Sequence, residues 1–217
     1  MRSLILAAAL VLTPLAASAA PAKPAAASAA EIARARAEGD AIIAAAGVAD
    51  LFTNVTDGAA IELRHNASGL VCGFDPGPGN EIVVSPVGPR GDSVSCTSHP
   101  LDFEQTVFAI RDGLNRDMHM ASAVAAIQIV YADVKPYRGR GMTMSREGEA
   151  EADRPVTQAF QARDGGRDVF ILASVAQRNG WVIKVHITAP LDKAFEAQLF
   201  AGLAMRAALM KIDEAKP

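Results

Sequence analysis

The chain has 217 residues, half of them hydrophobic, and a formal net charge of −3. This length fits one domain, and the alanine-rich apolar content is ample for a buried core. The sequence has no cluster of Lys and Arg, so it lacks the electrostatic footprint of nucleic-acid-binding proteins and a polybasic patch for anionic lipid. No apolar run after the N-terminal one approaches the roughly 20 residues that span a bilayer, and we predict no membrane span.

The N-terminal residues have the layout of a secretory signal peptide. A short basic start, Met1–Ser3, precedes an unbroken apolar run, Leu4–Leu12. Ala17 and Ala19 then supply the small side chains that a cleavage site needs. We therefore predict a signal peptide over residues 1–19 and a periplasmic or secreted location.

The remainder divides into a short lead-in and one predicted domain. Residues 20–30 are an Ala/Pro-rich segment typical of a flexible lead-in, and residues 31–217 are expected to form a single domain. Residues 31–52 contain apolar side chains and no proline, which predicts a helix. Residues 61–97 contain short alternating runs separated by Gly/Pro-rich turns, which predicts a small antiparallel sheet of two hairpins.

Two further helices are predicted in the middle of the chain. Phe103, Val107, Ile110 and Leu114 recur at spacings of four, three and four, as on one face of an amphipathic helix. The run 121–134 is apolar nearly all round and indicates a buried helix, although its portion 127–131 also fits a strand.

Three strands and a helix are predicted in the last third. The strands cover residues 156–162, 168–176 and 181–188, and Gly-rich connectors of the kind found in hairpin turns join them. Pro190 and Asp192 open a final helix. The order helix, strands, helices, strands, helix predicts an α+β fold, with helices packed on a mostly antiparallel sheet.

Cys72 and Cys96 are the two cysteines of the chain. In an oxidising compartment an even count predicts a disulfide. A redox pair and a two-thiolate metal site are the alternatives, but there is no Cys-x-x-Cys motif to lower a thiol pKa.

Two segments resemble known families. His65–Pro76, with the pattern HxxSGLxC, and Arg90–Cys96, with RGDxxSC, together resemble a pattern in small secreted bacterial proteins of uncharacterised function. The tail Asp168–Met210, with Gly180–Val185 ahead of a proline and a long helix, is similar to PsbP/Mog1-type α/β/α sandwiches. The second resemblance implies an accessory or binding module, and neither brings a catalytic residue to this chain.

Two short clusters of Met and His residues predict a candidate copper site. Met118, His119, Met120, Met142 and Met144 offer thioether and imidazole ligands, which suit Cu(I). The alternative is that these methionines fill gaps in the core.

The common catalytic signatures, including Gly-x-Ser-x-Gly and His-Glu-x-x-His, are missing from the sequence. Ser68, His65 and Asp75 lie close together in the chain, but a tight turn explains this serine equally well. We therefore expect an exported, non-enzymatic binding or accessory protein without a cofactor, whose partner is an unidentified protein or small molecule. The alternatives are a periplasmic copper-binding protein and a hydrolase with an unrecognised site.

Overall fold

The computed structural model describes residues 26–142 and 151–215. The predicted signal peptide, 1–19, and Met144 lie outside these residues. The elements in chain order are α1 (Ala29–Ala46), β1 (Phe52–Asn54), β2 (Ile61–His65), β3 (Val71–Phe74), β4 (Glu81–Val84), β5 (Ser93–Ser98), β6 (Glu104–Ile110), α2 (Arg116–Val130), β7 (Ala132–Pro136), η1 (Glu151–Asp153), β8 (Val156–Asp164), β9 (Arg167–Arg178), β10 (Trp181–Pro190), η2 (Leu191–Lys193) and α3 (Ala194–Glu214). The predicted α+β class, with a mostly antiparallel sheet, is confirmed.

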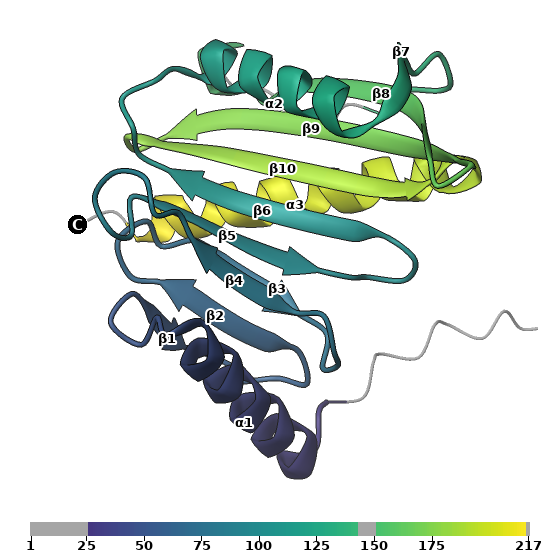
Figure 1. The fold of residues 1–217 in the computed structure, drawn as a ribbon. Helices are drawn as coiled ribbons and strands as arrows, with labels where there is room; N and C mark the ends of the chain where they lie inside the picture. Colours follow the sequence, from purple (N-terminus) through teal and green to yellow (C-terminus); the bar gives the residue numbers. More distant parts are fainter. Residues whose placement is uncertain (1–25, 143–150, 216–217) are drawn as a thin grey trace, which may run out of the picture.

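The strands form two antiparallel sheets. The large sheet has seven strands in the order β4-β5-β6-β10-β9-β8-β7, and the small sheet has three in the order β1-β2-β3. Helices α2 and α3 lie on opposite faces of the large sheet, while α1 lies against the small sheet (Figure 1). The helices and sheets therefore form layers, with the large sheet in the middle.

Two hydrophobic cores fill the space between these layers. The larger core contains side chains from Ala35 near the N-terminus to Ile212 near the C-terminus. It joins α1, the small sheet and α3 to one face of the large sheet. The smaller core lies under α2 and includes Met120 and Ile127. Strand β9 contributes to both, because its successive side chains point to opposite faces and both faces are covered.

The prediction of a helix around residues 103–114 is wrong, since residues 104–110 form strand β6. Its apolar side chains are spaced like a helix because β6 has apolar neighbours on both faces. Val107 packs against the larger core, whereas Phe108 and Ile110 belong to the smaller one. The apolar run 121–134 is likewise divided between α2 and β7, and Ile129, which the prediction would bury, is 84% exposed.

The hairpins of residues 61–97 do not form one sheet. Strands β2 and β3 pair in the small sheet, while β4 and β5 form an edge of the large sheet. The Gly/Pro-rich turn at residues 75–80 carries the chain from one sheet to the other. The helix α1 begins at Ala29, where Ser28 and Glu31 form a capping box, and thus slightly before the end of the predicted lead-in.

The C-terminal elements follow the prediction closely. Strands β8, β9 and β10 match the three predicted strands within two residues at each end, and α3 is the predicted final helix. Along β10, Trp181, Ile183 and Val185 enter the larger core, as their alternation predicts. In α3, however, Phe195 is exposed, and small residues such as Ala197 and Ala201 pack against the sheet.

Candidate functional site

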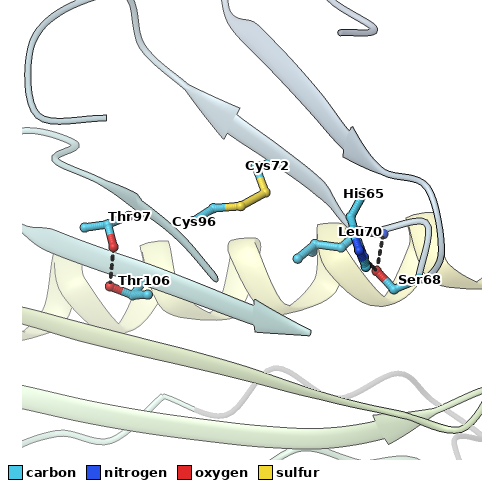
Figure 2. Close-up of a disulfide and its surroundings, with 7 residues drawn as sticks. All are labelled: His65, Ser68, Leu70, Cys72, Cys96, Thr97 and Thr106. Atoms are coloured by element: carbon cyan, nitrogen blue, oxygen red, sulfur yellow. Dashed lines mark hydrogen bonds between the residues drawn. A yellow bond between two sulfur atoms is a disulfide. The ribbon is translucent and has the colours of Figure 1, made fainter. Parts of the chain in front are cut away.

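Cys72 and Cys96 lie at disulfide distance and connect the two sheets. Cys72 is on β3 of the small sheet and Cys96 is on β5 of the large one, with their Cα atoms 6.0 Å apart (Figure 2). Both residues are buried in the larger core. The cysteine pair therefore links strand β3 of the small sheet to strand β5 of the large sheet.

His65 and Ser68 interact with each other, but deep inside the protein. His65 Nδ1 lies 2.9 Å from Ser68 Oγ, which also accepts a hydrogen bond from the backbone N–H of Leu70 (Figure 2). His65 has no exposed surface and packs against the rings of Phe52 and Trp181. Burial, together with the nearby positive charge of Arg111, lowers the pKa of His65 to about 4, against a smaller opposing effect of Asp92.

This geometry makes the His65–Ser68 pair a clamp on the turn between β2 and β3. Asp75, the third residue of the group considered in the sequence, lies at the other end of β3. The structure thus brings His65 and Ser68 together and leaves Asp75 apart from them.

The first residues of the Arg90–Cys96 segment hold its loop in place through ion pairs. Arg90 donates hydrogen bonds to the carboxylate of Asp50, and Asp92 pairs with Arg111. The guanidinium of Arg111 in turn lies 4.6 Å from the centre of the Trp181 ring. These contacts fasten the loop before β5 to the rest of the protein.

The described residues of the predicted copper site lie on two sides of the large sheet. Met118, His119 and Met120 are on α2, where Met118 is exposed, Met120 is buried and His119 Nε2 lies 3.1 Å from Asp112. The backbone N–H of Met142 donates to the side chain of Gln198 on α3. Since α2 and α3 cover opposite faces, the structure does not bring Met142 to the α2 residues.

In residues 26–142 and 151–215, no three His, Cys, Asp or Glu side chains are grouped so that they could hold a metal ion. Within the same residues, no helix has both the length and the apolar character needed to cross a membrane.

A cleft of about 350 Å³ lies where the small sheet, the β5–β6 connection and α3 meet. Phe74, Phe200 and prolines form its apolar walls. Its polar lining is rich in hydrogen-bond acceptors and contains Glu62, Asp75, Asn80, Ser98, His99 and Gln105. The segment His65–Pro76, which resembles a pattern in small secreted bacterial proteins, therefore ends in the wall of this cleft.

Hydrogen bonds fix the rim of the cleft. The side-chain amide of Asn80 donates to the backbone oxygens of Asp75 and Gly77, and the N–H of Gly77 donates to Glu38 of α1 at 2.6 Å. On the same rim Gly79 adopts a φ of +90°, and a Cβ there would lie 2.8 Å from the ring of His99. These contacts restrain the backbone of the rim.

One polar group at the cleft lacks a partner. The Oε1 atom of Gln105 is enclosed and has no hydrogen bond in the described part of the chain. An enclosed acceptor without a donor is unfavourable by about 1–3 kcal/mol. Because Gln105 lines the cleft, a bound molecule that donates a hydrogen bond would satisfy this oxygen if the amide turned toward it.

Ser98, His99 and Asp75 all line the cleft, so the arrangement bears on the hydrolase alternative. A Ser-His-Asp relay works through hydrogen bonds between its three members. Between residues 26 and 142, and between 151 and 215, no hydrogen bond joins these three side chains.

Sequence reasoning missed Gln105 and Phe200 as residues of a site. The available signal was the turn Asp75–Asn80, whose two Pro-Gly pairs predict a stiff loop next to the cysteine strand. The positions of Gln105 and Phe200 follow from the pairing of β6 in the large sheet and from the placement of α3.

No protein-family model matches the chain, and no curated protein matches its sequence. Among solved structures, PA94 of Pseudomonas aeruginosa, a protein of unknown function, is similar at 14% identity and a TM-score of 0.33, over 63% of this chain and 88% of that one. LpqN of Mycobacterium tuberculosis, involved in cell envelope biogenesis, is similar at 12% identity and a TM-score of 0.31, over 63% of this chain and 85% of its own. Similarity at this level transfers no role to the present protein.

Proposed function

We propose that the protein is an exported, non-enzymatic binding protein that holds a small molecule in the cleft lined by Gln105 and Phe200. The observation that carries this proposal is the enclosed, unpartnered amide oxygen of Gln105 in the wall of a concave site. Ligand sites are typically preformed clefts of about 300–1,000 Å³ that combine apolar walls with a few polar groups.

Other features support the same reading. The stiff rim needs no ordering on binding, which reduces the entropy loss of association. The polar and aromatic groups come from four separate parts of the chain, and packing holds each of them. Export is supported by the sequence of residues 1–19 and by a cysteine pair at disulfide distance, which suits an oxidising compartment.

Native mass spectrometry of the protein isolated from its producing cell tests the proposal. We expect a small molecule to remain bound to the wild type and to be lost, or bound at least tenfold more weakly, in Gln105→Met. Gln158→Met is the matched control, because Gln158 is an exposed residue of β8 far from the cleft. Equal retention by the two variants, or turnover of the bound molecule, would contradict the proposal.

A further inference from the structure

The face of the large sheet that carries α2 is only partly covered. Helix α2 packs on β9, β8 and β7, and strands β6, β5 and β4 extend past it (Figure 1). This face is opposite to the one that carries α3 and the cleft.

The strand register gathers polar side chains on this uncovered part. Residues paired across antiparallel strands project from the same face of a sheet. The pairing of β5, β6 and β10 therefore forms two adjacent rows: Ser95, Phe108 and Lys184 in one, and Thr97, Thr106 and His186 in the next.

Two groups that can carry positive charge lie side by side here, without an acidic partner. The Lys184 ammonium lies 4.0 Å from the centre of the Phe108 ring, and no ion pair joins it to a carboxylate among the described residues. Burial lowers the pKa of Lys184, and burial together with Lys184 lowers the pKa of His186 to about 4. The carboxylates nearest in register, Glu81 and Glu104, are exposed at the margins of the face and contribute to neither shift.

Hydroxyl groups surround this pair. Thr97 Oγ1 and Thr106 Oγ1 are 3.0 Å apart (Figure 2), and Tyr131 at the end of α2 lies 3.1 Å from the hydroxyl of Thr188. In each pair one hydroxyl donates to the other, so the accepting hydroxyl keeps its own proton for a ligand. The surface thus offers hydrogen-bond donors next to an ammonium group.

We propose that this face binds a small oxyanion, a carboxylate or a phosphate group, between Lys184 and His186. A half-buried ammonium without a counter-charge is unfavourable, and an anion that accepts hydrogen bonds from it relieves this penalty. The site lies on the other side of the sheet from the cleft, so it does not depend on the function proposed above.

The test is a titration followed by NMR, with sodium phosphate and sodium acetate as separate probes against sodium chloride at constant ionic strength. We expect saturable shifts of the Thr106 and His186 amides. Acetate and phosphate acting alike would indicate a carboxylate-type site, and phosphate acting alone a phosphoryl site. Binding should also raise the pKa of His186 by about one unit, because the anion stabilises its charged form.

Lys184→Met keeps the apolar stem and removes the charge, so it should weaken binding at least tenfold. Lys135→Met, at an exposed lysine on β7 of the same sheet, should bind like the wild type. His186→Gln serves as a second variant and should weaken binding several-fold. Equal affinities of the Lys184 and Lys135 variants, or no saturable shift with either probe at millimolar concentration, would overturn the proposal.

Discussion

His65 is fully buried and His186 is half-buried, and burial is the main cause that lowers the pKa of each to about 4. In the unfolded chain a histidine titrates near pH 6.5. Between these two values the unfolded chain binds more protons than the folded protein, so the stability of the fold increases with pH in this window. Each histidine makes the protein less stable as the pH falls from about 6.5 toward 4.

We therefore expect the free energy of unfolding to fall by about 3 kcal/mol per histidine between pH 7 and pH 4. Urea denaturation at a series of pH values in chloride buffer measures it. His186→Gln should remove roughly half of the contribution that His65 and His186 make to this pH dependence. A profile that is the same in the wild type and in His186→Gln would refute this assignment.

The interaction of His65 with Ser68 could be anticipated from the sequence, because the two residues flank one short turn. Their complete burial could not. It depends on Phe52 and Trp181, which come from a strand before the turn and from a strand far along the chain. The same holds for Lys184 and His186, whose shared face follows from alternation along β10 but whose surroundings come from β5 and β6.

At the scale of elements, α1 reaches the small sheet through a glycine. A Cβ at Gly39 would lie 2.9 Å from Nδ2 of Asn54 and 3.0 Å from Cδ2 of Leu63. The same Nδ2 donates to the backbone oxygen of Arg36 and to the carboxylate of Asp40. The close approach of helix and sheet thus depends on the missing side chain.

Gly39→Ala should destabilise the protein by about 1–2 kcal/mol, although alanine is the better helix former, because overpacking outweighs the gain in helix propensity. Chemical denaturation measures the change. Gly58→Ala is the control, since a Cβ there meets nothing within 4 Å, and its effect should stay within about 0.5 kcal/mol. A stabilised Gly39→Ala protein would show that α1 does not pack as closely as described.

Periodicity predicted β10, which has one fully buried face, but failed for β6, which has apolar side chains on both faces. Strand β10 alternates between core and half-buried positions, and its bounds were predicted well. Strand β6 has apolar side chains on both faces, so its spacing resembled that of a helix. In α3 the small residues Ala197 and Ala201 form the packed side and the larger Phe195 lies outside, an order that hydrophobicity alone does not reveal.

At the scale of the whole molecule, the cysteine pair joins the two sheets over a separation of 24 residues. Closing a loop of this length restricts the unfolded chain by about 3.5 kcal/mol in the chain-entropy model. The double variant Cys72→Ala/Cys96→Ala should lose about that much free energy of unfolding. Denaturation with and without reductant measures it.

Reductant should destabilise the wild type to a similar extent and leave the double variant unaffected. Two reactive thiols in the denatured but unreduced protein would contradict the pairing.

The α+β class follows from the order of the predicted elements, but the division into two sheets does not. Nothing local distinguishes the β2–β3 hairpin from the β4–β5 hairpin, and only their pairing partners place them in different sheets. The cleft arises at the junction of these sheets, which is why its lining could not be assembled from the sequence.

The pairing of β6 with β10 also affects how the protein folds. These neighbours in the sheet are separated in the chain by α2, β7, β8 and β9, and the larger core needs side chains from Ala35 to Ile212 (Figure 1). Contacts between distant parts of a chain form slowly, because the loop between them must first be ordered. During synthesis the first half of the chain therefore emerges before strand β10, which pairs with β6, and helix α3, which covers the larger core, have been made. If the protein is exported, as we propose, its chain would remain in a state that can be threaded through a membrane until its last third is made.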